Sequence, residues 1–257
     1  MNKMKSEHKP RSKVMRKLNR KSSIVSILPQ DLLLEVTKQI ASKSSTPLRD
    51  IRVLRATCKS FYRASKEKLV GRSLAVDKED MLQWWENNAY FALLRDCADC
   101  DNLEANFILG VEEIYNLNQG RSGLQHLQRA MDGGHLAAAY FMAILLFRHA
   151  ATKYDAMNIL NRVSTGDLSS TKSVTPCTKS GNPTVNRCRR ETIRVIRKSW
   201  KKEFEIEPGV PCKHRNCGRD DGDGVIDPWV KDGESPRVFC SHLCRWTYEY
   251  HNFFGQI

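Results

Sequence analysis

The sequence lacks any long hydrophobic run. Its longest uninterrupted apolar stretch is the twelve-residue segment "LAAAYFMAILLF" at 136–147, whereas a membrane-spanning helix needs about 20 such residues. No apolar segment follows the basic residues at the N-terminus, so we expect no secretory signal. These absences predict a chain without a membrane partner, in which 136–147 forms a buried core helix.

Catalytic motifs are missing as well. The 257 residues contain no Ser-His-Asp set, no phosphate-binding loop and no paired acidic site, and these are the patterns that carry hydrolytic or phosphoryl-transfer chemistry. We therefore expect no catalytic activity. Apolar residues make up 40% of the chain, which favours several folded modules with polar tails and linkers over one large globule.

Basic charge is unevenly distributed along the chain, whose net charge is +13. Residues 1–22 hold nine Lys or Arg against one Glu, and residues 187–202 hold eight against one. Residues 96–120 hold six acidic residues and no Lys or Arg. The first segment is predicted to be a disordered tail. It is either a nuclear localisation signal or acid-binding arm, or a solvated tail without a specific role.

Residues 24–70 contain three short amphipathic patterns. The segment "SILPQDLLLEVTKQIA" places apolar residues three to four positions apart from Leu32 to Ile40, which predicts a helix. Thr46 and Pro47 suit the N-cap and first position of a second helix, and "CKSFYRAS" predicts a third. Because such short helices bury little surface alone, they must pack on one another or on a partner.

This region resembles an F-box. The resemblance rests on "LPQDLLLEV" and, about thirty residues later, "CKSFY", with Phe61-Tyr62 where a tryptophan is usual. An F-box protein is the substrate receptor of a cullin-based ubiquitin ligase and docks on a Skp-type adaptor through an apolar helical surface. The alternative is an ordinary three-helix core. The resemblance implies that the adaptor-binding residues are Leu28, Pro29, Leu32, Val36 and Leu54.

An internal repeat of 33 residues follows within 78–163. The segment "DNLEANFILGVEEIY" at 101–115 aligns with "GHLAAAYFMAILLFR" at 134–148, and "RSGLQHLQRA" aligns with a later segment so that Leu127 matches Leu160 at the same offset. Each unit is predicted to be a helix, a short turn and a second helix.

These units resemble SEL-like repeats, a branch of the tetratricopeptide-type helical solenoids. Small residues such as Gly110 and Ala138 allow close helix approach. The resemblance implies a curved stack whose concave face suits protein binding. Because fewer than two full repeats are visible, helices around Trp84 and Trp85 are expected to cap the stack. The alternative is a plain helical bundle.

Residues 164–190 are predicted to form a flexible linker, since the segment 164–186 holds ten Ser or Thr. Cys177 and Cys188 at its edges are expected to be free thiols. The segment "ETIRVIRKSWKKEFEIE" then places apolar residues from Ile193 to Phe204 on one helical face. Its basic residues form either a solvated face or a contact for nucleic acid or an acidic peptide.

Two close cysteine pairs lie in the last fifty residues. Cys212 and Cys217 are followed, after 22 intervening residues, by Cys240 and Cys244. In a chain expected to stay in a reducing compartment, such pairs predict a tetrahedral zinc site rather than disulfides. The first pair is expected in a loop. The second is expected at a helix N-terminus, where residues i and i+4 share one face and the helix dipole favours thiolates.

This arrangement resembles a treble-clef finger. Four thiolates leave no coordination position for water, so the single zinc ion is predicted to be structural. His214 and His242 are rival ligands, and four unliganded cysteines are the other alternative; a redox role is disfavoured because the cysteines there lack Cys-x2-Cys spacing. The segment has few aliphatic residues, so metal binding is expected to supply much of its folding free energy.

The predicted fold is therefore mainly α. It consists of a disordered basic tail (1–22), a three-helix F-box (23–71), a short α-solenoid (78–163), a flexible linker (164–190), and a basic helix with a small zinc-binding finger (191–257). This order resembles a group of plant F-box proteins, some of which carry a MYND-type finger. The MYND pattern has seven or eight ligands, so the single four-ligand cluster here is only MYND-like.

The resemblance implies a non-catalytic substrate-recognition subunit of an SCF-type cullin ubiquitin ligase. Its F-box would hold the Skp-type adaptor and, through it, the cullin, while the repeats and finger would hold an unknown target protein. One alternative is a nucleic-acid-binding regulator that uses the basic segments and the finger and binds with steep salt dependence. Another is a repeat scaffold without a ligase link. The expected location is the nucleus and/or cytoplasm.

Overall fold

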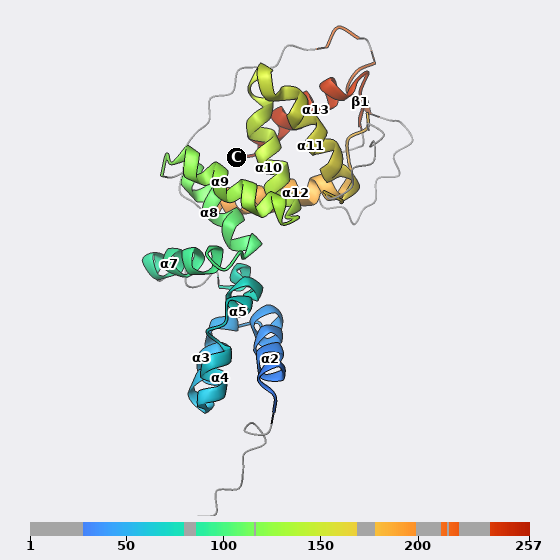
Figure 1. Cartoon of the computed structure of the whole chain (residues 1–257). Coiled ribbons are helices and arrows are strands. Elements are labelled where there is room, and N and C mark those ends of the chain that lie inside the picture. The colour runs from blue at the N-terminus through green and yellow to red at the C-terminus, as the bar shows by residue number, and fades with distance from the viewer. Residues whose placement is uncertain are drawn as a thin grey trace, which may run out of the picture.

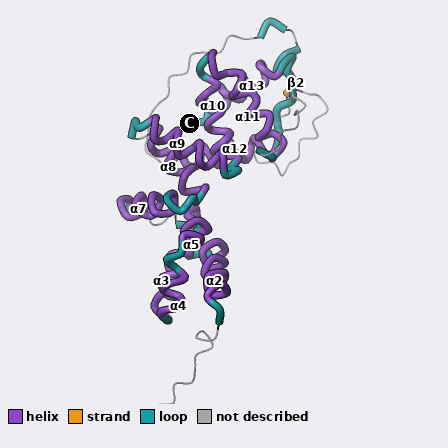
Figure 2. The backbone as a smooth tube through the Cα atoms, viewed as in Figure 1, coloured by secondary structure: helices purple, strands orange, loops and turns teal. Residues whose placement is uncertain are grey.

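The computed structural model describes residues 28–79, 86–115, 117–168, 178–198, 212–214, 216–220 and 237–257. Within these ranges the chain is mainly helical. Residues 28–79 form an N-terminal lobe, and the described residues from 86 onward form a larger C-terminal lobe stacked on it (Figures 1 and 2). No helix of the described part is long and apolar enough to cross a membrane. The predicted tail 1–22 and the residues around Trp84 lie outside the described ranges.

The N-terminal lobe contains the three helices predicted from residues 24–70 and one more. They are α2 (Gln30–Lys43), α3 (Pro47–Thr57), α4 (Lys59–Ala64) and α5 (Lys68–Ser73), followed by the 3-10 turn η1 (Val76–Lys78). The prediction that Pro47 opens the second helix is confirmed. The core of the lobe is small and includes Leu33, Ala41, Ile51 and Val70. The expected boundary at residue 71 falls inside α5.

Three helices of the C-terminal lobe begin 33 residues apart, which confirms the repeat. These helices are α7 (Asn87–Ala98), α9 (Gly120–Asp132) and α11 (Lys153–Thr165). Each buries the same three positions: Tyr90, Leu94 and Cys97; Gly123, Leu127 and Ala130; Ala156, Leu160 and Val163. The repeat therefore starts one helix earlier than the pairwise alignment of 101–163 indicated, and α7 is the second helix of a preceding unit.

The first helices of the repeats are α8 (Leu103–Tyr115) and α10 (Leu136–Phe147), also 33 residues apart. Their caps repeat as well. Asn102 Oδ1 accepts a hydrogen bond from the Ala105 amide at 3.0 Å, and His135 Nδ1 accepts one from the Ala138 amide at 3.1 Å. Because its Nδ1 accepts, His135 must carry its proton on Nε2, which lies 2.9 Å from Glu104 Oε2.

Two further helices form a third layer on the repeats. Helix α12 (Pro183–Lys198) packs against α8, α10 and α11, and α13 (His242–Phe254) packs against α11. As a result α8 is buried continuously from Ala105 to Glu113, and nine residues of α10 are buried. The repeats therefore do not form an open two-layer stack here, because helix 136–147 is apolar all round and needs neighbours on every side.

The predicted linker 164–190 extends too far along the chain, because its last residues belong to a helix. Helix α12 begins at Pro183, and Val185 and Cys188 on its first turns are buried. Composition suggested flexibility, but Asn182 caps the helix by accepting from the amides of Thr184 and Val185 at 3.0 and 3.1 Å. An Asn N-cap followed by Pro at the first position is a recognisable helix start, and this signal was missed.

The finger is joined to the repeats and is not a separate module. Strands β1 (Arg219–Asp220) and β2 (Arg237–Val238) form an antiparallel hairpin. The backbone before α12 extends this hairpin, since the Ser180 amide donates to Arg237 O at 2.9 Å and the Phe239 amide donates to Thr178 O at 3.0 Å. The expected division at 190/191 is thus wrong, because strand pairing and helix packing cross it.

The two lobes are connected by a polar contact at the start of α8. The buried Asn102 side chain donates from Nδ2 to the carbonyls of Gly71 and Leu74 at 2.9 and 2.8 Å. Gly71 also lies close to Cys100: a Cβ at position 71 would stand 2.8 Å from the Cys100 sulfur. One residue thus caps a repeat helix and fixes the C-terminal end of α5, which holds the lobes in a defined orientation.

Candidate functional site

One face of the N-terminal lobe exposes apolar side chains in a regular row. Leu28, Leu32 and Val36 follow one another at four-residue spacing and are 38%, 52% and 45% exposed, and Pro29 beside them is exposed. The opposite face of α2 turns Leu33 into the core. Leu32 and Leu33, which the sequence pattern placed in one stripe, therefore lie on different faces. The term "α2 row" is used below for Leu28, Leu32 and Val36.

The fifth residue of the predicted adaptor surface differs from the others. Leu54 on α3 is half-buried. Exposed apolar residues on the neighbouring helices were missed: Val53 on α3 is 60% exposed, and Tyr62 on α4 is 46% exposed with the Lys66 ammonium 4.4 Å from its ring centre. No periodicity marks Val53, because it lies outside the apolar stripe of its own helix. Only its exposed fraction in the folded structure identifies Val53 as a surface residue.

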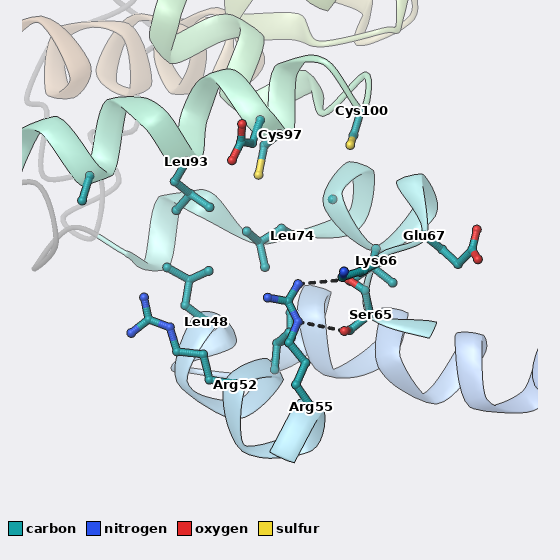
Figure 3. A pocket seen from close by; sticks show the side chains of 15 residues that line it. Leu48, Arg52, Arg55, Ser65, Lys66, Glu67, Leu74, Leu93, Cys97 and Cys100 are labelled. Carbon is teal, nitrogen blue, oxygen red and sulfur yellow. Dashed lines mark hydrogen bonds between the residues drawn. The ribbon is translucent and has the colours of Figure 1, made fainter. Parts of the chain in front are cut away.

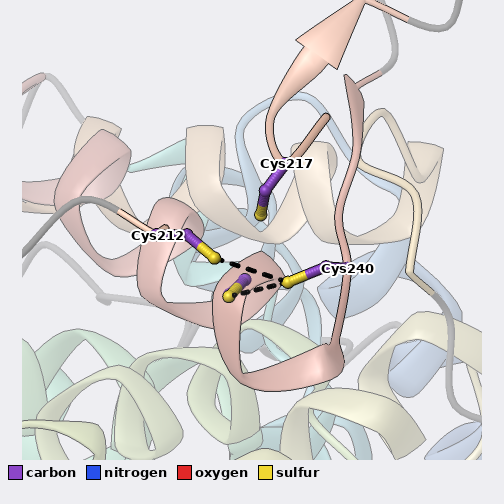
Figure 4. A group of neighbouring side chains, drawn as sticks. Cys212, Cys217 and Cys240 are labelled. Atoms are coloured by element: carbon purple, nitrogen blue, oxygen red, sulfur yellow. Dashed lines mark hydrogen bonds between the residues drawn. The ribbon is translucent and has the colours of Figure 1, made fainter. Parts of the chain in front are cut away.

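The structure brings the four cysteines of the tail together (Figure 4). Their sulfur atoms all lie within 4.8 Å of one another. The Cys240 sulfur is 3.5 Å from those of Cys212 and Cys244. Four sulfurs around a tetrahedral zinc ion would be roughly 3.8 Å apart, given Zn–S bonds of about 2.3 Å. The cluster is therefore of a size that could bind one metal ion.

Local backbone structure builds this cluster from three segments. A turn in which the Cys217 amide donates to His214 O at 3.1 Å presents the first pair, and Gly218 leaves it with φ +80°, a conformation that favours glycine. Ser241 caps α13 by accepting from the Cys244 amide at 3.2 Å. The first pair thus lies in a loop and Cys244 lies in the first turn of a helix, as predicted.

Cys240 differs from its prediction. It precedes α13, which begins at His242, so the two sulfurs of this pair do not share a helical face by i, i+4 spacing. The reason is the extended backbone of Ser241 at φ −156° and ψ 164°, which cannot continue a helix towards its N-terminus. Cys240 reaches the cluster from the end of β2 instead.

Hydrogen bonds within the cluster shift the pKa values of its thiols, and a bound cation would change which thiols keep their protons. Donation of a hydrogen bond to Cys244 raises the pKa of the Cys240 thiol to about 12, while the amide of His214 lowers the pKa of Cys212. Without a cation, Cys240 keeps its proton at neutral pH. A metal ion would replace that proton, since thiolates are the ligands. Among the described residues no histidine nitrogen belongs to the group, although His214 and His242 are both described.

A buried ion pair attaches the finger helix to the repeats. Arg189 of α12 donates from Nε and Nη2 to the two carboxylate oxygens of Glu249 on α13, at 2.8 and 2.7 Å, and the Tyr140 hydroxyl of α10 donates to Glu249 at 2.7 Å. Burial raises the pKa of Tyr140 well above its ordinary value. Nearby, Trp246 is fully buried and its indole N–H donates to Asn161 Oδ1 at 3.1 Å. Sequence reasoning missed this network, because Arg189 looked like one of several surface cations.

The predicted basic segment 187–202 is split by the structure. Arg189 is buried and paired, whereas the exposed residues of α12 beyond its first turn are Arg187, Arg190, Arg194 and Arg197. Residues 199–202, with the expected Trp200, lie outside the described ranges, as does Phe204. The apolar face of the helix is present from Val185 to Ile196.

A cavity of about 450 Å³ lies between the two lobes (Figure 3). Helices α3 and α5 provide one wall, including Leu48 and Leu74, and α7 provides the other, including Leu93 and Cys97. Arg55 is anchored at its edge by donating from Nε to Ser65 Oγ at 2.8 Å. Burial raises the pKa of the Cys97 thiol to about 12, so this thiol is protonated and unreactive at neutral pH.

Comparison with known families supports the repeat. A family described as plant tetratrico peptide repeats matches residues 77–197. This range begins at η1 and ends in α12, so it includes α7 and the third-layer helix together with the two repeats found by alignment. No solved structure matches the chain at a significant level.

Comparison with curated proteins identifies relatives from Arabidopsis thaliana. The chain is 31% identical to "Putative F-box protein At1g67623" over 59% of this chain and 50% of that protein. It is 28% identical to "F-box protein At5g50450" over 47% of this chain and 35% of that protein, and 27% identical to "F-box protein At1g67340" over 49% and 33%. The chain thus spans half or less of the length of these relatives, and its homologues are plant F-box proteins.

Proposed function

We propose that the protein is a substrate-recognition subunit of an SCF-type cullin ubiquitin ligase, which binds a Skp-type adaptor with the α2 row, Pro29 and Leu54. The observation that carries this proposal is the α2 row itself. Leu32 and Val36 on one face of α2, together with Leu28 just before the helix, are 38 to 52% exposed. A contiguous exposed apolar patch indicates an interaction site, and an amphipathic helix is a common docking element.

The family comparisons support the same role. The relatives are F-box proteins by name, and F-box subunits contribute recognition rather than chemistry. The fixed joint at Asn102 supports the proposal in a second way. A receptor must hold its target at a defined place relative to the ligase, and the hydrogen bonds from Asn102 to Gly71 and Leu74 restrict how the lobes move. Cullin binding would occur only through the adaptor.

We further propose that the cysteine cluster binds one structural zinc ion through Cys212, Cys217, Cys240 and Cys244. Sulfur-only coordination favours zinc over calcium or magnesium, which prefer oxygen ligands. With four protein ligands no position remains for a reacting water. Zinc would supply a cross-link between the loop, β2 and α13. The SEL-like subclass of the repeats and the nucleus and/or cytoplasm as location stay predictions.

Co-purification with a Skp-type adaptor tests the proposed function. The full chain is co-expressed with a tagged adaptor, and wild type is compared with Leu32→Asp plus Val36→Asp. We expect retention of wild type and loss of at least about 90% of the double variant, because two carboxylates would be buried in an apolar interface. The matched control is Leu124→Asp, a change at an apolar residue of α9 that is 39% exposed. Failure of folded wild type to retain the adaptor would contradict the proposal.

A further inference from the structure

We propose that the outer face of α12 is the docking surface for an Asp/Glu-rich segment of the target protein. This inference rests on the proposed function, because it assigns the target-binding surface of the same receptor. The four arginines Arg187, Arg190, Arg194 and Arg197 form this surface and are called the arginine stripe below.

The stripe follows from the way in which α12 packs. The helix covers α8 and α10 with a buried face that includes Val185, Ile193 and Ile196. Its other side carries the exposed residues of the helix. Spacings of three, four and three residues place the stripe within one narrow arc of the helix. At a rise of about 1.5 Å per residue the stripe is about 15 Å long.

The residue type indicates the kind of group that binds. Every exposed residue of α12 beyond the first turn is an arginine and none is a lysine. Arginine presents a planar fork that matches a carboxylate in a bidentate geometry. Arg197 donates from Nη2 to the Gln256 carbonyl at 2.8 Å. The pair of Arg187 with Glu191 is long at 4.0 Å, and both side chains are about half-exposed, so a surface contact of this kind is weak. An incoming carboxylate can compete with it.

The spacing favours several carboxylates over one phosphate. A single phosphoryl group is held by arginines that converge on one point, whereas these four are spread at about one per helical turn. Acidic residues along a peptide present negative charges at similar intervals of roughly 5 to 7 Å. The stripe thus fits a run of Asp and Glu rather than one phosphorylated residue.

The surroundings disfavour nucleic acid as the partner. Helix α8, against which α12 packs, contains three Glu and no Lys or Arg. The cationic surface therefore does not spread across the neighbouring helix, whereas a nucleic-acid site tracks the phosphate backbone over a wide basic face. In addition Arg189, the fifth arginine of α12, is buried by Glu249 and does not contribute.

Peptide binding by fluorescence anisotropy tests this proposal. The full chain is titrated into a labelled peptide of alternating Glu and Ser, with the matching Gln-Ser peptide as the uncharged probe. We expect binding of the acidic peptide only, weakened about tenfold or more by Arg190→Gln plus Arg194→Gln. The variant with Lys at both positions should bind the acidic peptide only about threefold more weakly than wild type, because it keeps the charge and loses only the planar guanidinium fork.

Controls separate the stripe from general charge and from the adaptor site. Arg121→Gln plus Arg148→Gln removes two exposed arginines that lie outside α12 and should change the affinity less than about twofold. The stripe variant should still co-purify with the adaptor, so loss of peptide binding is distinguishable from failure of the proposed function. A melting temperature like that of wild type shows that the stripe variant is folded.

Three results would overturn the inference. The first is absence of acidic-peptide binding by wild type, or binding that the Gln variant leaves unchanged. The second is tighter binding of a single-phosphoserine peptide, which would make the occupant a phosphorylated segment. The third is a single-stranded RNA that binds more tightly at physiological salt and displaces the peptide, which would support the nucleic-acid alternative.

Discussion

The two lobes use their apolar residues in opposite ways. In the N-terminal lobe α2 keeps Leu32 and Val36 exposed while Leu33 enters a small core. In the C-terminal lobe α8 and α10 are buried on every side, and their neighbours expose mainly polar residues. The N-terminal lobe thus leaves apolar side chains of α2 exposed, whereas the C-terminal lobe buries those of α8 and α10.

This difference indicates how each lobe would recognise its partner. The α2 row offers burial of apolar area, which gives affinity with little directional demand. The α12 surface offers arginine forks, which give directional contacts that depend on salt. The adaptor and the target would thus bind by different physical means, and binding of one need not disturb the other. The four predictions below test this comparison, from the largest expected effect to the smallest.

Loss of the buried ion pair should affect the C-terminal lobe most. Glu249→Ala leaves the Arg189 guanidinium buried without its partner and removes the acceptor of the Tyr140 hydroxyl. We expect the free energy of unfolding to fall by about 4 kcal/mol, measured by urea denaturation. The double variant Arg189→Met plus Glu249→Leu removes both charges and should regain more than half of that loss. If Glu249→Ala lowered the free energy of unfolding by less than about 1 kcal/mol, the role of α13 in closing the lobe would be contradicted.

Truncation of an apolar side chain to alanine should differ in cost between the lobes. Leu160→Ala removes a fully buried side chain of α11 and should lower the free energy of unfolding by about 3 kcal/mol. Val36→Ala in the α2 row should change it by less than about 0.5 kcal/mol yet weaken adaptor binding. The two variants are compared by urea denaturation and by titration with the adaptor. Equal stability losses would contradict the assignment of the α2 row as free surface.

Metal removal should destabilise the finger without unfolding α13. The helix is held by the Arg189 pair and by the buried Trp246 and Phe253, so metal is not its main source of order. We expect a strong zinc chelator to lower the free energy of unfolding by roughly 2 kcal/mol, while helix content by far-UV circular dichroism changes little. Cys217→Ser should reproduce the loss and no longer respond to the chelator. Loss of the helical signal on chelation would show that zinc organises the whole C-terminal lobe.

A mild pH dependence should come from the C-terminal lobe. Burial lowers the pKa of His126 below its ordinary value of 6.5, against the opposing effects of Glu113 and Asp99; Arg129 adds to the lowering, and Asn106 Oδ1 lies 2.8 Å from the ring. Because the folded state disfavours the protonated ring, its stabilisation is present above pH 6.5 and is lost as the pH falls through the lowered folded value.

The measurement is the free energy of unfolding at pH 7.5 and 5.5 for wild type and His126→Gln. On acidification we expect the free energy of unfolding to fall less in the variant than in wild type. Residues 28–79 contain no histidine, so the N-terminal lobe offers no competing source among histidines. An identical decrease in both proteins would assign the pH dependence to other groups.

Local patterns predicted the helices of both lobes well. Pro47 gave the start of α3, and the 33-residue offset gave the starts of α9 and α11 relative to each other. Such signals are local or periodic, so they survive without knowledge of the fold. The start of α12 was missed because its Ser/Thr-rich approach suggested a linker, although Asn182-Pro183 marked it.

The candidate sites were less evenly predictable. The spacing of the four cysteines predicted their meeting, because close pairs of cysteines have few other uses in such a sequence. The α2 row required the structure, since Leu32 and Leu33 are adjacent and identical in type yet differ in burial. The cavity between the lobes and the exposed Val53 carried no sequence signal, because both arise where separate elements meet.

The sequence by itself determined the helical character, the repeat period and the pairing of the four cysteines, because these depend on residue type and spacing alone. Only the tertiary structure decided which arginine of α12 is buried and which four face outward. Residues 187, 189 and 190 are all arginines within one turn of the helix. Arg189 alone is buried, because it pairs with Glu249, sixty residues further along the chain. The third layer also required the structure. An all-apolar helix is expected to be buried on every side, but its sequence does not show which elements cover it.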